Sequence, residues 1–534
     1  MSVHVPQVHT TRAESPAMNW KRPLFLAHRW AGIVLCAFFV LWFGSGIVMM
    51  YVEFPQLSRT ERLASLPKLD FSAARLTPGQ AVASLQASDF TVVGTPRRNL
   101  ALEVKDAAAP LPAIASVRLT MLMGRPMYVV SIAGPAQPRA VFADTGELLA
   151  APDAAAALAI ATDFATRAYL DRRLSPRYQE LLQTDQWSVS SGLNAHRPLH
   201  LIAVGDEAGT ELYVSSSTGE VVRDSHRSER VLNYFGAVTH WLYPTVIRRY
   251  PEAWAWMVEI LASAGALLAV SGIWIGLLRW KRRSQPGKSS IPYRGLMRWH
   301  HITGLAFGLF ALTWVFSGLL SMNPGSFNPS RTPSAVETLV YSGKPLTPAD
   351  FELPRFVSSE VIDAELMHYD RHPFYRTTLS DGQVRLLSAT GDVSAPRPDS
   401  SAMLERVTQL MPQARVLDAR VMTAFDNYYY TRKPENGSRP LPVIRVRFDD
   451  AQRTWFHLNP ITGEVMERST HINRLYRWLF NGLHSFDWLW LWERRPLWDI
   501  VVITFSLGGL SLSLLGLFGA VRRLRIDLGW ARRT

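Results

Sequence analysis

Four apolar stretches constrain this chain of 534 residues more than any other feature of its sequence. A transmembrane helix needs about 20 consecutive apolar residues to cross the hydrocarbon core of a bilayer. Glu259 is the only charged residue within the four stretches, which run over residues 30–52, 254–278, 302–323 and 500–521. They predict transmembrane helices at residues 24–52, 254–278, 299–323 and 497–521. The first is too long for a signal peptide and no small-residue cleavage site follows it, so we interpret it as an uncleaved anchor.

The net charge of +13 is concentrated beside these stretches. Segments 1–29, 279–298 and 522–534 hold 16 Lys and Arg residues and two acidic residues, whereas the rest of the chain holds 41 basic and 42 acidic residues. Basic residues that flank membrane helices favour the cytoplasmic side of the membrane. The charge pattern therefore indicates topology rather than a nucleic-acid-binding groove, and we expect no nucleic acid as a partner.

This topology places both termini in the cytoplasm and the two long loops outside it, which in a bacterium with two membranes is the periplasm. Each loop ends in an aromatic segment with helical spacing, typical of a helix that lies at the membrane surface. The predicted order is a cytoplasmic N-terminus (1–23), a first helix (24–52), a periplasmic domain (53–229), an interfacial helix (230–253), a second helix (254–278), a cytoplasmic loop (279–298), a third helix (299–323), a second periplasmic domain (324–473), an interfacial helix (474–496), a fourth helix (497–521) and a cytoplasmic C-terminus (522–534).

The membrane segments repeat one another at fixed spacing. The series His28, Gly32, Ser45 and Gly46 recurs without a gap as His300, Gly304, Ser317 and Gly318. The series Arg230, His240, Trp254, Gly272 and Arg279 recurs as Arg474, His484, Trp498, Gly516 and Arg523. Such a repeat predicts an α-helical membrane bundle of four helices in two pseudo-symmetric halves.

The two long loops repeat as well. A T-G-E or T-G-D turn follows a strand-like segment in four places, at residues 145–147, 218–220, 390–392 and 462–464. Helical patterns lie between the turns, as in residues 156–170 and 401–412. Strand pairs joined by a glycine turn and accompanied by one helix predict two small α+β modules in each loop.

Several kinds of chemistry have no sequence support. Cys36 is the only cysteine, which rules out a disulfide framework, a thiolate zinc site and a cysteine-held iron–sulfur cluster. It lies in an apolar run, which is typical of a small buried residue. No glycine-rich dinucleotide or P-loop motif is present, so we expect no dinucleotide site. No H-E-x-x-H motif is present either, which argues against a zinc protease.

Six motifs give the chain a resemblance to a known family. They are HRWAG (28–32), DNYYYTR (426–432), LPVIRVRFDD (441–450), TWFHLNPITGEV (454–465), RWLFNGLHSFD (477–487) and RRPLWD (494–499). In these motifs the chain resembles the PepSY-associated transmembrane (PepSY_TM) proteins, iron-regulated proteins of the bacterial inner membrane, and the later half is the closer match. The resemblance implies that the loop domains are PepSY-like. Some members of this family resemble ferric-siderophore reductases that hold haem between their helices. Membership of a family implies a shared fold more strongly than a shared function.

Four histidines are the candidate cofactor ligands. The repeat places His28 with His300 near the cytoplasmic face and His240 with His484 near the outer face. Coordinating side chains are costly within a membrane, and a pair of neutral imidazoles facing one another across a helix bundle suits axial ligation of haem iron. We therefore predict two b-type haems. A structural role, in which the histidines bond to backbone or lipid headgroups, is the alternative.

Three further histidines are weaker candidates for haem or metal ligands. His301 adjoins His300 but cannot share its helix face, and Arg29 occupies the corresponding position in the first half. His226 and His471 each follow the second T-G-E turn of their loop. They could cap the outer site or bind an additional haem or metal, and a hydrogen-bonded or surface role is the competing interpretation.

The resulting hypothesis is a haem-containing membrane oxidoreductase that passes electrons to a periplasmic acceptor such as a ferric siderophore, which would release iron. Since the chain has no dinucleotide site, the electrons would come from a membrane quinol or a partner protein. Two alternatives stay open: a membrane binding or regulatory protein without a cofactor, and a component of an iron-uptake transporter.

Overall fold

The computed structural model describes residues 21–85, 89–90, 113–170, 173–280, 290–354, 359–389 and 398–527. Seven of the 16 basic residues in the flanking segments lie outside these residues, in segments 1–20, 281–289 and 528–534. The predicted T-G-D turn at residues 390–392 also lies outside them.

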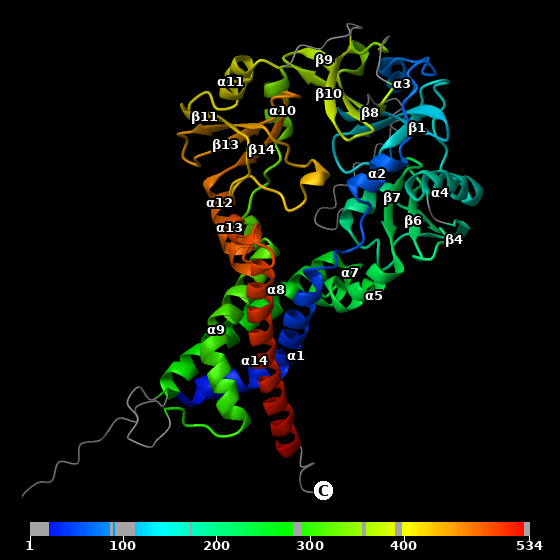
Figure 1. Ribbon diagram of the computed structural model, residues 1–534. Coiled ribbons are helices and arrows are strands. Elements are labelled where there is room, and N and C mark those ends of the chain that lie inside the picture. Colours follow the sequence, from blue (N-terminus) through cyan, green and yellow to red (C-terminus); the bar gives the residue numbers. More distant parts are fainter. Residues whose placement is uncertain are drawn as a thin grey trace, which may run out of the picture. The chain divides into compact units, whose positions relative to one another are not determined.

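Within the described residues, four long apolar helices confirm the number and approximate position of the predicted spans (Figure 1). They are α1 (Lys21–Met49), α8 (Pro251–Arg279), α9 (Leu296–Ser321) and α14 (Leu497–Asp527). Each contains a window with a mean hydropathy between 1.8 and 2.3, so each is long and apolar enough to cross a membrane. Chain contacts divide the molecule into two compact units. The bundle unit comprises residues 1–43, 260–316 and 504–534, and the loop unit comprises residues 44–259 and 317–503.

Glycines allow close packing between helices of the bundle unit. A Cβ atom on Gly265 of α8 would lie 2.9 Å from Phe39, and one on Gly509 of α14 would lie 2.5 Å from Phe43. In the same unit the rings of Phe310 and Phe505 stack with their centroids 3.7 Å apart. Small residues at such contacts are typical of membrane helix packing, because they let the backbone of one helix approach the side chains of the next.

The loop unit contains three antiparallel sheets. The first module of each loop contributes three strands to one six-stranded sheet in the order β10-β9-β8-β1-β2-β3. Its strands are β1 (Ile114–Leu122), β2 (Arg125–Ile132), β3 (Arg139–Phe142), β8 (Val361–Tyr369), β9 (His372–Leu379) and β10 (Val384–Ser388). The second modules form two four-stranded sheets, from β4 (Arg177–Leu182), β5 (Leu199–Ala203), β6 (Glu211–Ser215) and β7 (Val221–Ser225), and from β11 (Val416–Met422), β12 (Val443–Phe448), β13 (Trp455–Leu458) and β14 (Val465–Ser469).

The six-stranded sheet is a feature that the sequence analysis did not predict, since it assigned the two loops to separate domains. Strands β1 and β8 pair antiparallel through Arg118↔Glu365 and Leu119↔Ala364, and Figure 1 shows them side by side. Each would otherwise be the open edge of a three-stranded sheet, with unpaired backbone groups. Pairing of the two edges therefore joins the loops into one body.

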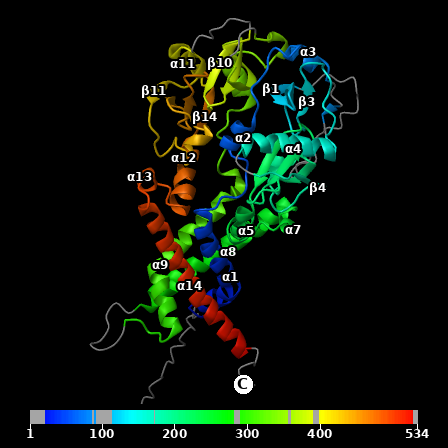
Figure 2. The same ribbon diagram turned by 45° about the vertical axis from the view of Figure 1, so that its right-hand side comes forward.

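One helix lies between the two sheets of each loop. Apolar residues of α4 (Ala154–Ala168), including Ile160 and Phe164, share a core with Met127 of β2 and Leu212 of β6. In the second loop, Met403 and Val407 of α11 (Ser400–Gln409) share a core with residues of β9 and β12. Figure 2 shows α4 beside the β4–β7 sheet. The predicted α+β composition of the loops is thus present.

The T-G-E turns have a clear structural role. Gly219 and Gly463 have φ values of +69° and +74°, a region that favours glycine. The glutamates that follow them contact arginines of the six-stranded sheet: Arg118 donates two bonds to Glu220 at 2.7 and 2.8 Å, and Arg376 donates to Glu464 at 3.0 Å. Each second module is therefore tied to the shared sheet through its turn.

The two predicted interfacial helices are divided in the structure. The segment 230–253 contains the end of α5 (Arg227–Phe235), then α6 (Ala237–His240) and α7 (Thr245–Arg248), with breaks at Gly236 and Pro244. The segment 474–496 contains the end of α12 (His471–Arg477), a π-helical turn (Trp478–Gly482) and α13 (Leu489–Trp492). Glycine and proline interrupt the helical backbone, so the aromatic spacing alone overestimated the length of each helix.

Candidate functional site

The loop unit brings His240 and His484 together although they lie 244 residues apart in the sequence. Their ring centroids are 6.1 Å apart and the ring planes are inclined by 75°. His240 ends α6, and His484 follows the π-helical turn that precedes α13. Both imidazoles are half-buried. We call them the facing histidines.

Each facing histidine contacts a serine–glycine pair on a long helix. His240 Nδ1 lies 3.1 Å from Ser45 Oγ, and His484 Nδ1 lies 3.0 Å from Ser317 Oγ. A Cβ atom on the following glycine, Gly46 or Gly318, would lie 3.6 Å from the Cε1 atom of the same ring. The serine fixes the orientation of the ring through Nδ1, and the glycine leaves room for the ring beside the helix.

The DNYYYTR segment holds the part of the chain that carries His484. Asn427 accepts a bond from the Leu489 backbone N–H at 3.1 Å through its side chain and one from Arg477 Nε at 2.7 Å through its carbonyl. The Tyr430 hydroxyl donates a short bond to Asp487, and burial together with Asp487 raises the pKa of Tyr430, so that the hydroxyl keeps its proton. The DNYYYTR motif therefore positions the segment that carries His484.

A shorter segment does the same for His240. The Gln186 amide nitrogen donates to the Tyr243 carbonyl at 2.9 Å, and the Gln186 side-chain oxygen accepts from the Thr245 backbone N–H at 3.1 Å. Asp185 orders this segment by accepting bonds from the backbone N–H groups of Trp187 and Ser188. Both facing histidines are thus held by a serine on one side and a clamped backbone segment on the other.

His28 has the same kind of environment within the bundle unit. Its Nδ1 lies 3.0 Å from Ser271 Oγ, whose hydroxyl donates to the Leu268 carbonyl at 2.9 Å. Because that hydroxyl hydrogen is used, Ser271 accepts the His28 Nδ1–H, and the lone pair of the ring resides on Nε2. A Cβ atom on Gly272 would lie only 2.8 Å from His28 Cε1.

His300 resembles His28 in one contact and differs in another. A Cβ atom on Gly516 would lie 3.4 Å from His300 Cε1 and 2.7 Å from the Sγ atom of Cys36, which is buried as the sequence predicts. Leu515 stands at the position that corresponds to Ser271, so this ring has no equivalent serine. His28 and His300 are close enough for the charge of one to act on the other.

The three weaker candidates lie in other surroundings. His301 is buried and packs against Tyr293 with a centroid distance of 5.3 Å. His471 is exposed at the start of α12, where its Nδ1 lies 3.0 Å from the Gln452 carbonyl. His226 forms a cluster with Glu61 and Asp224.

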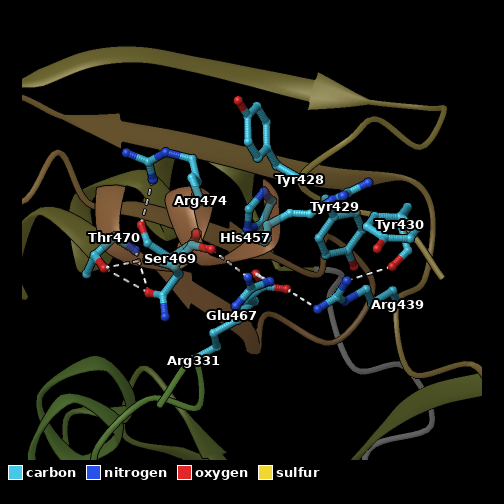
Figure 3. Close-up of polar contacts among 12 residues, drawn as sticks. Arg331, Tyr428, Tyr429, Tyr430, Arg439, His457, Glu467, Ser469, Thr470 and Arg474 are labelled. Atoms are coloured by element: carbon cyan, nitrogen blue, oxygen red, sulfur yellow. Dashed lines mark hydrogen bonds and ion pairs between the residues drawn. The ribbon is translucent and has the colours of Figure 1, made fainter. Parts of the chain in front are cut away.

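A cavity of about 390 Å³ opens in the second module of the second loop. Its walls include Arg331, Tyr430 and Arg439. Figure 3 shows both arginines directed at Glu467, whose side chain is only 5 % exposed; the distances are 3.3 Å from Arg331 and 2.8 Å from Arg439. Two cations surround one carboxylate, so the cavity wall keeps an excess of positive charge. Tyr430 connects this wall to Asp487, three residues after His484.

The sequence predicted His28, His300, His240 and His484 as ligands, but not the residues that hold them. Ser45, Gly46, Ser317 and Gly318 served there only as evidence of duplication. Their fixed spacing from His28 and His300 was a real signal, although these residues contact the other two histidines, His240 and His484. No sequence signal distinguished Ser271, because its counterpart is a leucine.

Comparison with known proteins agrees with the membrane architecture. No protein of curated function matches the chain. The model of the PepSY-associated TM region matches residues 25–350, which is more than half of the sequence and includes HRWAG, whereas the later motifs of the resemblance lie beyond the match. With four apolar helices and this match, the chain is a membrane protein that belongs to the PepSY-associated transmembrane family.

Proposed function

We propose that this protein is a haem-containing oxidoreductase of the bacterial inner membrane that passes electrons to a ferric chelate in the periplasm. The observation that carries the proposal is the pair of facing histidines, each oriented by a serine through Nδ1. The proposal includes the topology expected from the flanking charges, with both termini in the cytoplasm.

The spacing of the facing histidines fits two axial ligands of one metal ion. Two metal–nitrogen bonds of about 2 Å each, and roughly 1 Å from each nitrogen to its ring centre, add up to about 6 Å between ring centroids. The observed distance is 6.1 Å. Histidines that ligate metal usually donate the other ring N–H to an oriented acceptor, and Ser45 and Ser317 are placed to accept it.

His28 and His300 would hold a second haem. The tautomer of His28, with hydrogen on Nδ1 and the lone pair on Nε2, is the one that a metal ligand requires. Gly272 and Gly516 leave space beside the two rings, as Gly46 and Gly318 do for the facing histidines. Space for an imidazole ring beside the helix thus explains all four repeated glycines.

Bound haem would supply one-electron chemistry. The protein's own groups would orient the imidazoles and bind the substrate. Reduction of ferric to ferrous iron consumes one electron, and a quinol that gives two electrons and two protons would reduce two ferric ions. Ferrous iron is a softer cation that binds hard oxygen ligands less tightly, so reduction would release it from the chelate.

The cavity beside Tyr430 is the proposed chelate site. Its two arginines suit the oxygen-rich, anionic groups of a ferric siderophore, since guanidinium groups bind such oxygens through several donors. Tyr430 and Asp487 link the cavity wall to the segment that carries His484. A chelate in this cavity would therefore lie against the segment that the electron must reach.

Anaerobic mixing of the dithionite-reduced, detergent-solubilised protein with a ferric trihydroxamate tests the proposal. We expect the haem bands to reoxidise while a ferrous-specific dye develops colour. The gallium complex of the same chelator has the same shape and accepts no electron, so it should leave the haem reduced. A reduced protein that the ferric complex does not reoxidise would refute the proposed acceptor.

Two arginine variants locate the site in the same assay. Arg331→Ala combined with Arg439→Ala should raise the chelate concentration needed for half-maximal rate by about tenfold or more. Arg415→Ala is the control, because that side chain is 93 % exposed and does not line the cavity. Equal rates for all three proteins would show that the chelate binds elsewhere.

A further inference from the structure

Glu61, Asp224 and His226 form a cluster in the first loop that the proposed electron transfer does not use. Their ligand atoms all lie within 4.8 Å of one another. His226 Nε2 is 3.9 Å from Glu61 Oε1 and 4.0 Å from Asp224 Oδ2. Asp224 is almost fully buried, with 4 % of its side chain exposed, whereas Glu61 is 29 % exposed and gives the cluster access to solvent.

Neighbouring residues orient Glu61, Asp224 and His226 so that their ligand atoms converge. His226 Nδ1 lies 2.9 Å from Thr210 Oγ1, and the Thr210 hydroxyl donates to Asp206 at 2.7 Å. Thr210 therefore accepts the His226 Nδ1–H, and Nε2 is the ring nitrogen that faces the two carboxylates and would bind an ion once deprotonated.

The carboxylates are held in a comparable way. Glu61 belongs to the capping box of α2 (Arg59–Ser65), in which Glu61 Oε2 accepts the Ser58 backbone N–H at 3.0 Å, and this leaves Oε1 on the side of the cluster. The Tyr169 hydroxyl donates to Asp224 Oδ2 at 3.1 Å. A ring whose second nitrogen is bonded and carboxylates that accept outer hydrogen bonds are typical of metal ligands.

The second loop provides an internal comparison at the corresponding positions. Thr454 donates to Asp450 at 2.9 Å, as Thr210 does to Asp206, and Glu337 occupies the capping box that corresponds to that of Glu61. Asp224 and His226 are replaced there by Arg468 and Thr470.

This replacement changes the charge of the cluster. The Arg468 guanidinium forms an ion pair with Glu337 at 3.3 Å, so the second loop supplies its own cation. In the first loop two carboxylates and an imidazole nitrogen converge at the equivalent place, where Asp224 stands in the position of Arg468.

We infer that Glu61, Asp224 and His226 bind a divalent first-row transition-metal ion in the first loop. Bonds of about 2.0–2.2 Å in a tetrahedral site place ligand atoms roughly 3.5 Å apart, so the observed distances of 3.9 and 4.0 Å need only a small contraction. One imidazole and two carboxylates suit Zn²⁺, Mn²⁺ or Fe²⁺, with a fourth position for water. This site is independent of the proposed haem function.

Zinc titration of the full-length protein, with metal binding followed calorimetrically against a competing chelator, tests this inference. Zinc separates the signal from haem iron, which is measured in the same samples. We expect one equivalent of Zn²⁺ per chain. The double variant Asp224→Arg with His226→Thr reproduces the pair found in the second loop and should lose this binding while the haem content stays unchanged.

Two single variants refine the test. Thr210→Val removes the partner of His226 Nδ1 and should weaken Zn²⁺ binding by about 10–100-fold. His471→Ala removes an exposed histidine and should leave binding intact. The inference is overturned if the wild-type protein binds no Zn²⁺, or if the double variant binds it as tightly as the wild type.

Discussion

At the scale of single residues, the four histidines proposed as haem ligands share one local pattern. Each ring lies against a glycine of a long helix, and for three of them a serine adjoins that glycine and contacts Nδ1. Glycine allows a close approach of the ring, and serine fixes its rotation. The fourth, His300, has Leu515 in place of the serine, and nothing in the structure explains that difference.

The distances between these glycines and the histidine rings predict that alanine substitutions will differ in their effect on haem binding. Gly272→Ala places a Cβ atom 2.8 Å from His28 Cε1 and must displace the ring, whereas Gly46→Ala places one 3.6 Å from His240, an ordinary contact. We expect Gly272→Ala to shift or remove about half of the haem absorbance and Gly46→Ala to leave it unchanged. Spectra of the two purified variants compare them directly. Identical spectra would contradict the assignment of His28.

A second residue-scale prediction concerns His457 on β13. Burial, and then the charge of Arg445, lower the pKa of His457 from 6.5 to about 3. Between pH 6.5 and 3 the unfolded chain binds a proton that the folded protein does not, so the free energy of unfolding falls as the pH is lowered through this window, by up to a few kcal/mol.

His457→Asn removes this titration. Stability of the wild type should therefore fall more steeply than that of the variant between pH 7 and pH 5, as measured by thermal unfolding followed through tryptophan fluorescence. His471→Ala is the control, because His471 is exposed, and it should keep the wild-type slope. Parallel slopes for the wild type and His457→Asn would show that His457 titrates normally.

At the scale of elements, short segments outside the helices determine where the facing histidines lie. The DNYYYTR segment holds the chain on both sides of His484 through Asn427, and the Gln186 segment holds the chain after His240. The long helices supply the serines and glycines, while these segments hold the parts of the chain that carry the imidazoles.

This division predicts the effect of Asn427→Ala. The variant loses the bond to the Leu489 backbone and loosens the segment that carries His484. We expect haem at the facing histidines to be retained about 10–100-fold less tightly in a transfer assay to apomyoglobin. Gln383→Ala, which changes an exposed amide in the β9–β10 turn, should behave like the wild type. Equal retention by both variants would remove the proposed role of the motif.

Much of the element scale was readable from the sequence. Continuous apolar stretches predicted the four helices, and the repeated T-G-E turns predicted the modules, because these patterns are local. The pairing of β1 with β8 was not readable, since edge strands carry no local signal for their partner. The cluster of Glu61 with Asp224 was also hidden, because 163 residues separate the two in the chain.

At the scale of the whole molecule, the shared sheet makes the two loops one body. Arg118 on β1 contacts Glu220 of the first loop at 2.7 Å and Asp363 of the second at 2.9 Å. All three side chains are largely buried. Since the facing histidines come one from each loop, a joined pair of loops keeps the two imidazoles at a fixed spacing.

Arg118→Ala should therefore destabilise the loops by about 3–5 kcal/mol, because it removes the arginine partner of Glu220 and leaves Asp363 with only Arg62, 3.6 Å away. Faster hydrogen exchange in β1 and β8 would report the change. Arg420→Ala, an exposed arginine on β11, is the control and should leave exchange unchanged. Unaltered exchange in the Arg118 variant would show that the β1–β8 pairing alone joins the loops.

The haem content of the purified full-length protein tests the central claim most directly. We predict two b-type haems per chain, measured by absorption and as the pyridine haemochrome, one haem in His240→Ala and two in His471→Ala. A colourless protein after expression with ample haem, or the full haem content in His240→Ala, would contradict the assignment of the facing histidines.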